Sequence, residues 1–226
     1  MIMSTQITYE TPVRTRRRHK RGLPLLPLLL LCAFLLGLFS GWQLRGSADG
    51  DGSSLFSLFR KQPPEMPQWV TVDLLPENPY SRPGIELKQV RGIVIHYVGN
   101  PGTSAQNNRN YFADLAQTGS AYASSHFVIG LEGEVIQCVP LDEISYCSNS
   151  RNNDTIAIEC CHPDEGGAFN QATYDALVDL TAYLADYYGL DREEIIRHYD
   201  VTGKQCPKYY VDNEDAWLRF KADVFG

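Results

Sequence analysis

The sequence predicts a layered α/β domain whose strands run in mixed directions. Short runs rich in β-branched residues alternate with longer segments in which apolar residues recur at three- and four-residue steps. Two of the short runs are separated only by Leu131-Glu132-Gly133, which indicates a β-hairpin and therefore an antiparallel pair. Of the 226 residues, 43% are hydrophobic and 21% charged. This balance excludes a wholly disordered chain and a miniprotein held together by disulfides.

Residues 1–22 form a basic arm with six Lys or Arg side chains and a single acidic residue, Glu10. The whole chain has a formal charge of −7, so the part after the arm is five charges more negative, at −12. An acidic body does not present the basic surface that nucleic acids require, and we predict no nucleic-acid partner.

Residues 23–42 contain no charged side chain over twenty positions, about the length that a transmembrane helix needs. The basic arm before them predicts a single-pass membrane protein with a cytoplasmic N-terminus and an exported domain. The alternative is a secretory signal peptide whose cleavage would release the domain. The run is longer than a typical signal core and lacks a clean small-x-small cleavage pair, which favours the retained anchor.

Residues 43–65 are rich in Gly, Ser and Asp and end in a proline pair, a composition typical of a linker. The remaining residues, 66–226, are predicted to form one domain. Its strands are expected at 91–97, 125–130, 134–139 and 155–160, and its helices at 104–118, 170–188 and 214–224. Ser104 and Asn170 are suitable N-caps, and Gly119 and Gly189 are suitable helix ends.

Two histidines and one cysteine stand out as metal-ligand candidates. His96 ends an apolar strand before a Gly/Pro loop, and His198 lies eight residues before Cys206 across a turn that contains Gly203. Imidazole and thiolate are preferred zinc ligands, and a catalytic zinc takes three protein ligands. A hydrogen-bonded core histidine and a structural cysteine before proline are the competing interpretations, and the spacing alone leaves both open.

The segments IVIHYVGNPG, SSHFVIGLEGEVIQCVP, RNNDTIAIECCHPDE and IIRHYDVTGKQCP resemble zinc-dependent N-acetylmuramoyl-L-alanine amidases, which are related to phage lysozyme amidases and peptidoglycan recognition proteins. Together they cover essentially all of residues 68–220, and the similarity is closest to the Gram-positive, clostridial type. The resemblance implies a central mixed β-sheet flanked by α-helices, here preceded by one transmembrane helix. It also implies Zn²⁺ as cofactor, with His96, His198 and Cys206 as ligands.

Two further residues acquire catalytic roles through this resemblance. Glu159 is a carboxylate inside the apolar run TIAIEC, where an ionisable group is costly without a partner or a task. The resemblance implies that Glu159 acts on the zinc-bound water, since Ser125 stands where some phage members have a tyrosine. Lys204 matches the family lysine that faces the scissile carbonyl. A salt-bridged glutamate and a solvated turn lysine are the structural alternatives.

The other histidines and cysteines are predicted to have lesser roles. His126 is expected to pack or hydrogen-bond beneath the site, and His162 to border the groove. Cys138 and Cys147 could form a disulfide in an exported domain. Cys160 and Cys161 should point to opposite faces of one strand, and a thiolate nucleophile that pairs one of them with His162 ranks low.

The function implied by the resemblance is hydrolysis of the amide between N-acetylmuramic acid and L-alanine in peptidoglycan, by a zinc-activated water. Glu159 would handle the proton and Lys204 the oxyanion. Two alternatives are a non-catalytic peptidoglycan-binding module of the same fold, which typically lacks the Cys or Asp ligand, and a structural envelope protein with a vestigial site. We expect peptidoglycan as substrate, a monomer, and a catalytic domain that faces the cell wall.

Overall fold

The computed structural model describes residues 63–226. The basic arm, the expected anchor at 23–42 and most of the linker lie outside the described residues. Between residues 63 and 226, no helix has both the length and the apolar character needed to cross a membrane.

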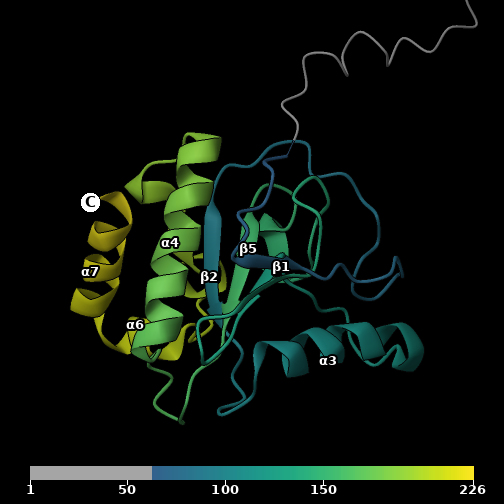
Figure 1. The fold of residues 1–226 in the computed structure, drawn as a ribbon, viewed down its shortest axis with the longest axis horizontal. Helices are drawn as coiled ribbons and strands as arrows, with labels where there is room; N and C mark the ends of the chain where they lie inside the picture. Colours follow the sequence, from purple (N-terminus) through teal and green to yellow (C-terminus); the bar gives the residue numbers. More distant parts are fainter. Residues whose placement is uncertain (1–62) are drawn as a thin grey trace, which may run out of the picture. The chain divides into compact units, whose positions relative to one another are not determined.

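A six-stranded sheet forms the centre of the described domain (Figure 1). The strands are β1 (Val70–Val72), β2 (Ile93–Tyr97), β3 (Phe127–Ile129), β4 (Val135–Gln137), β5 (Ile156–Cys160) and β6 (Ile195–Arg197). They lie side by side in the order β1-β4-β3-β5-β2-β6. Neighbouring strands are parallel except β3 and β4, the expected hairpin. The sheet is therefore mixed, as the sequence predicts.

Helices lie on both faces of this sheet. The longer ones are α3 (Ala105–Thr118), α4 (Gln171–Tyr188) and α7 (Glu214–Phe225), and the short ones are α5 (His198–Thr202) and α6 (Lys208–Asp212). Two 3₁₀ turns, η2 (Asn149–Arg151) and η3 (Arg192–Glu194), complete the elements that follow α3. Figure 1 shows α4, α6 and α7 together on one side of the sheet and α3 on the other. The flanked α/β architecture is confirmed.

The ends of the two longest helices match their sequence signals. The Ser104 side chain accepts a hydrogen bond from the Asn107 amide at the start of α3, and Gly119 ends the helix at φ 57°. The Asn170 side chain caps α4 by accepting from the Thr173 amide. These caps satisfy amide groups that would otherwise lack partners, which fixes where each helix begins.

Side-chain alternation along the strands divides the core into two parts. Phe127 and Ile129 of β3 pack in the larger part, among residues of α4 and α7. Val128, between them, packs in the smaller part with Phe112 of α3. Cys160 and Cys161 likewise fall in different parts, as expected from a period of two.

Cys138 and Cys147, for which the sequence left a disulfide open, are both free thiols. Cys138 is fully buried in the smaller core and its thiol contacts the Ile136 carbonyl at 3.8 Å. The Cys147 thiol instead donates to Glu159 Oε1 at 3.6 Å. The two sulfur atoms are thus engaged with different parts of the domain.

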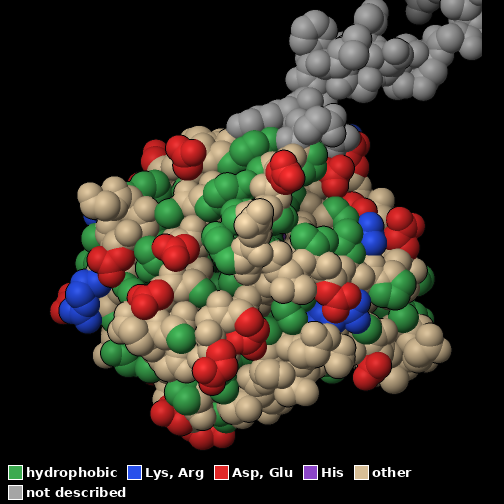
Figure 2. All heavy atoms as spheres, in the orientation of Figure 1, with side chains coloured by type: hydrophobic (Ala, Val, Ile, Leu, Met, Phe, Trp, Pro, Cys, Tyr) green, Lys and Arg blue, Asp and Glu red, His purple; other side chains and the backbone are tan. Residues whose placement is uncertain are grey.

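The face of the domain drawn in Figure 2 carries scattered acidic side chains and few basic ones. This distribution agrees with the negative charge that the sequence assigns to the body of the chain. The visible face offers no basic patch of the kind that nucleic acids bind.

Candidate metal centre and active site

The register between β2 and β5 brings the first metal-ligand candidate beside the candidate base. His96 of β2 is the direct partner of Glu159 of β5 in this parallel pair. Ile95 and Ile158, their neighbours, belong to the larger core, so the two polar side chains share the opposite face. His96 is 1% exposed. Residues 63 positions apart in sequence thereby line one site.

The other neighbour of β2 delivers the second histidine. Arg197 at the end of β6 pairs with Ile95, and His198 follows it as the first residue of α5. The His96 and His198 rings lie 4.7 Å apart between centroids. Sheet order, rather than sequence spacing, therefore places the two imidazoles together.

The turn that follows His198 places the thiol of Cys206 beside the two histidines. The Tyr199 amide donates to the Cys206 carbonyl at 2.9 Å, which closes the segment between them. Cys206 Sγ lies 3.8 Å from His96 Nδ1. The candidate ligand atoms of His96, His198 and Cys206 all lie within 4.8 Å of one another, and all three residues are buried. We call these three residues the His–Cys cluster.

The chemistry of the cluster fits a zinc ion. Its donor set is two imidazoles and one thiol, the type of set used by catalytic zinc sites with three protein ligands. His198 Nδ1 is buried and has no hydrogen-bond partner among the described residues. A buried polar atom without a partner is costly, and coordination of a metal would satisfy it.

The pKa shifts of the metal-free cluster all have the same physical origin. Burial lowers the pKa of His96 well below its ordinary value, and the nearby His198 and Lys204 lower it further. The pKa of His198 is lowered by burial and then by Lys204. Burial raises the pKa of the Cys206 thiol to about 12. The imidazoles are thus neutral and able to ligate, whereas metal binding would have to displace the thiol proton.

Glu159 is a carboxylate with an unused oxygen. Its Oε1 accepts from the Cys147 thiol, while Oε2 is buried and has no hydrogen-bond partner in the described part of the chain. Burial raises the pKa of Glu159 to about 7, and the Cys147 hydrogen bond and Lys204 oppose the rise. A carboxylate with a pKa near neutrality is suited to accept and return a proton.

Lys204 is exposed beside this cluster. Its positive charge contributes to the pKa of His96, His198, Glu159 and Cys206, which shows that it lies near all four. The five site residues predicted from the sequence therefore occupy one region of the domain.

His126 has the structural role expected of it. Its Nδ1 accepts from the Ala157 amide at 3.0 Å, and its Nε2 donates to the Glu143 carbonyl at 2.9 Å. Both ring nitrogens are thereby occupied beneath β5. Ser125 also has a partner, since its hydroxyl donates to the Ala157 carbonyl at 2.9 Å.

His162 is buried, and its ring lies 5.0 Å from the Tyr97 ring between centroids. Its Nδ1 donates to the Asp164 carbonyl at 2.7 Å. It belongs to no candidate metal group among residues 63–226. The thiolate nucleophile that would pair Cys160 or Cys161 with His162 has no support, because burial raises the pKa of both thiols.

Sequence reasoning did not connect three neighbours with the site: Cys147, which it considered only for a disulfide, and Ser148 and Asn149, which it did not consider. Cys147 joins His96 and Glu159 in a second group of close ligand atoms. Ser148 Oγ lies 3.2 Å from His96 Nε2, and Asn149 Oδ1 lies 2.8 Å from His198 Nε2. These contacts are tertiary, and no periodicity in the run CSNSRNND predicts them.

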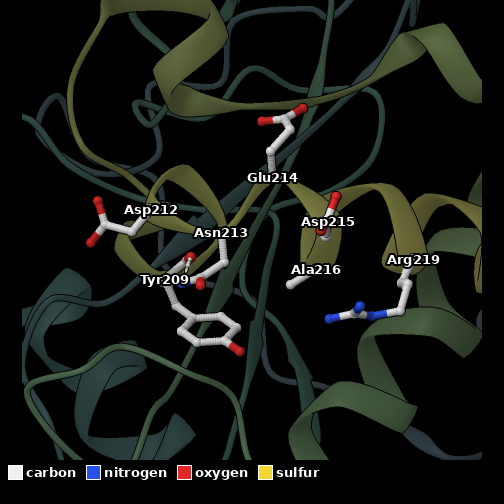
Figure 3. A pocket seen from close by; sticks show the side chains of 7 residues that line it. All are labelled: Tyr209, Asp212, Asn213, Glu214, Asp215, Ala216 and Arg219. Carbon is white, nitrogen blue, oxygen red and sulfur yellow. Dashed lines mark hydrogen bonds between the residues drawn. The ribbon is translucent and has the colours of Figure 1, made fainter.

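A separate polar pocket lies at the junction of α6 and α7 (Figure 3). Its lining includes the carboxylates of Asp212, Glu214 and Asp215, which Figure 3 shows pointing apart rather than toward a common point. Glu214 is already paired with Arg197 at 2.6 Å. The pocket shares no lining residue with the His–Cys cluster.

Solved structures share this fold over most of the described domain. A mutant endolysin from Bacillus subtilis superposes with a TM-score of 0.58 at 23% identity, covering 69% of this chain and 97% of that one. The catalytic domain of XlyA gives a TM-score of 0.57 at 23% identity, covering 69% and 98% of the two chains. At this identity the likeness concerns the fold.

Sequence comparisons are more specific. The chain is 33% identical over 175 residues to the N-acetylmuramoyl-L-alanine amidase BlyA of Bacillus subtilis, covering 68% of this chain and 46% of the relative. It is 36% identical over 159 residues to a probable N-acetylmuramoyl-L-alanine amidase of Bacillus licheniformis, covering 65% and 44%. The chain thus spans about half the length of these relatives.

The family described as N-acetylmuramoyl-L-alanine amidase, Amidase_2, matches residues 86–209. This range begins before β2 and ends after Cys206, so it contains every residue of the His–Cys cluster together with Glu159 and Lys204. The chain therefore belongs to the N-acetylmuramoyl-L-alanine amidase family.

Proposed function

We propose that this chain hydrolyses the amide bond between N-acetylmuramic acid and L-alanine in peptidoglycan, with zinc as cofactor. The observation that carries the proposal is the convergence of His96, His198 and Cys206 beside Glu159, inside the segment that matches the amidase family. A peptidoglycan-binding module without activity would need neither a complete ligand set nor a carboxylate with a buried oxygen that has no hydrogen-bond partner among the described residues.

The residues divide the chemistry among them. His96, His198 and Cys206 would hold the zinc ion, which when bound polarises the amide carbonyl and lowers the pKa of a water molecule. Glu159 accepts the proton of the attacking water at its unpartnered Oε2 and returns it to the departing amine. Lys204 stabilises the negative charge that develops on the carbonyl oxygen. The products are a free stem peptide and an unsubstituted glycan strand.

The location of the domain is part of the proposal. A retained helix at 23–42, with the basic arm in the cytoplasm, would hold the active site on the side of the membrane where peptidoglycan lies. Cleavage of the same segment would instead give a secreted enzyme. The Bacillus relatives support a Gram-positive type, whereas the narrower clostridial resemblance and the monomeric state stay predictions.

Digestion of purified sacculi, followed by mass spectrometry of the soluble fragments, tests the proposed bond. The expected products are stem peptides with a free L-alanine amino group and glycan without peptide. Muropeptides that keep the lactyl amide intact would contradict the proposal.

Cys206→Ser tests the zinc ligand. This variant should lose stoichiometric zinc and activity together, because a catalytic zinc with three protein ligands depends on each of them. Cys138→Ser is the matched control, since Cys138 is also a buried free thiol but lies in the smaller core. A full zinc equivalent and normal turnover in Cys206→Ser would refute the assignment.

A further inference from the structure

The loop of residues 147–152 contacts both histidines of the His–Cys cluster. Ser148 Oγ lies 3.2 Å from His96 Nε2, and Asn149 Oδ1 lies 2.8 Å from His198 Nε2. The ligand atoms of the cluster come from other segments, β2, α5 and the turn at Cys206. The 147–152 loop is therefore positioned to act on the cluster without being part of it.

The contact from Asn149 settles which nitrogen of His198 carries the hydrogen. An amide oxygen can only accept, so the Nε2 of a neutral His198 must donate to Asn149 Oδ1. The lone pair then lies on Nδ1, the buried nitrogen that has no partner among residues 63–226. Asn149 thus holds His198 in the tautomer that can bind a metal through Nδ1.

Ser148 contacts the other histidine through a hydroxyl, which can donate or accept a hydrogen bond. When this hydroxyl accepts from His96 Nε2, the lone pair of His96 lies on Nδ1. That Nδ1 is the atom that lies 3.8 Å from Cys206 Sγ. Both imidazoles are therefore contacted at Nε2, which leaves the Nδ1 atom of each available to a metal ion.

The backbone of the loop is fixed in a shape that few residues adopt. Asn149 has φ 53°, and among the described residues it is the only one other than glycine with a positive φ. Asparagine tolerates this left-handed conformation better than most residues do. Asn152 Oδ1 closes the loop by accepting from the Cys147 amide at 3.1 Å and from the Ser148 amide at 2.6 Å.

We propose that Ser148 and Asn149 are positioning residues that orient His96 and His198 for the metal ion, and that Asn149 also fixes the tautomer of His198. The inference rests on the proposed zinc chemistry and assigns the pair no contact with substrate. Partners that hold the second nitrogen of a ligating histidine commonly contribute 10- to 100-fold to metal affinity. A purely structural role would instead affect folding and leave metal affinity unchanged.

The test measures the zinc dissociation constant of the full 226-residue protein by competition with a chelator. Asn149→Gly accepts the positive φ but removes the hydrogen-bond acceptor, and should weaken zinc binding by about 10- to 100-fold. Asn149→Asp keeps an acceptor and should stay within about threefold of the unsubstituted protein. Asn153→Gly, at an exposed asparagine of the same segment, is the control and should have no effect.

A second pair of variants tests the other histidine. Ser148→Ala should weaken zinc binding, as Asn149→Gly does. Ser150→Ala, at an exposed serine two positions further along the chain, should leave zinc binding unchanged. The absorption spectrum of the Co²⁺-substituted protein gives a readout of ligand geometry that does not depend on turnover. Asn149→Gly should shift it because His198 is free to rotate, and Asn149→Asp should restore it.

Thermal unfolding of the metal-free proteins separates orientation from folding. Asn149 is exposed, so its removal costs little packing, and metal-free Asn149→Gly should melt close to the unsubstituted protein. Zinc affinity within twofold of normal in Asn149→Gly, or an Asn149→Asp variant as weak as Asn149→Gly, would overturn the inference while the proposed function stands. Failure of the unsubstituted protein to bind zinc would overturn both.

Discussion

Glu159 illustrates a conflict between stability and function within one side chain. Its strand is otherwise apolar, and within residues 63–226 the carboxylate has the Cys147 thiol as its single hydrogen-bond partner. Burial therefore penalises its charged form and raises its pKa to about 7. The role proposed for Glu159, accepting a proton near neutral pH, requires this raised pKa, and the metal-free fold consequently loses stability as pH rises from about 4.5 to 7.

Replacing the carboxylate by an amide should separate chemistry from binding. Glu159→Gln keeps the size of the side chain and leaves the three cluster residues untouched, but it removes the proposed base. Zinc content and peptidoglycan binding should stay near normal, while the rate of amide cleavage falls by a factor on the order of 10² or more. Cleavage at the normal rate would show that Glu159 is not the base. Another group near β5 would then have to accept the proton, and Ser125 and His126 would be the first to examine.

The same substitution should change stability in a pH-dependent way. The folded pKa of Glu159, about 7, lies above the ordinary value of 4.5, so the native state holds the proton more tightly than the unfolded state. The stability of the metal-free protein therefore falls as pH rises from about 4.5 to 7, by on the order of 3 kcal/mol from this group. Glu159→Gln lacks this loss and should be the more stable protein above pH 7.

Urea unfolding of the two metal-free proteins at pH 5 and pH 8 measures this effect. The unfolding free energy of Glu159→Gln, relative to that of the unsubstituted protein, should be higher at pH 8 than at pH 5. Groups that titrate alike in both proteins cancel in this comparison. If the difference in unfolding free energy between the two proteins were the same at both pH values, the pKa of Glu159 would not be raised in the folded state.

At the scale of elements, the sequence predicts what local patterns encode. The capped helices α3 and α4 and the strands β2 and β5 appear within a few residues of their expected positions. β1 (Val70–Val72) and β6 (Ile195–Arg197) were overlooked. They have three residues, as β3 and β4 do, but neither belongs to a hairpin that marks it in the sequence, and β6 follows the charged run DREE. Their identity as strands depends on pairing with β4 and β2, which is a tertiary property.

The same distinction applies to the site. His96, His198, Cys206, Glu159 and Lys204 could be selected through resemblance to a family, since each belongs to a motif. Ser148 and Asn149 could not, because their significance lies in contacts to residues 52 and 49 positions away. Side chains that orient a ligand leave no periodic or compositional signal.

The cap of α4 offers a test at this scale. Asn170 accepts from the Thr173 amide and also donates from Nδ2 to the Leu131 carbonyl in the β3–β4 loop at 2.8 Å. Asn170→Ala removes both hydrogen bonds and should lower the unfolding free energy by about 1–2 kcal/mol. Gln171→Ala is the control, since the exposed Gln171 side chain donates to exposed Asp175 within α4 and caps no backbone amide in the described part of the chain. Equal stability of the two variants in urea unfolding would contradict the cap.

At the scale of the whole molecule, charge and hydropathy are distributed unevenly along the chain. A basic arm, an uncharged run of twenty residues and an acidic body follow one another in sequence. The acidic residues that Figure 2 shows on one face of the domain would disfavour close approach to an anionic membrane surface. If residues 23–42 anchor the chain in the membrane, as proposed, a linker at 43–65 would allow the domain to stay away from the membrane and within reach of the cell wall.

This arrangement leads to a prediction on topology. If residues 23–42 are a retained anchor, protease added to intact protoplasts should remove the catalytic domain and spare the basic arm, because only the domain lies outside. Antibodies against residues 1–22 and against α7 would follow the two ends, and protoplasts lysed before proteolysis would show that the arm is itself cleavable. A protein in the culture medium that begins near Gln43 would instead identify the run as a cleaved signal. Because that outcome changes the site of action without altering the His–Cys cluster, the released protein should still cleave sacculi at the same bond.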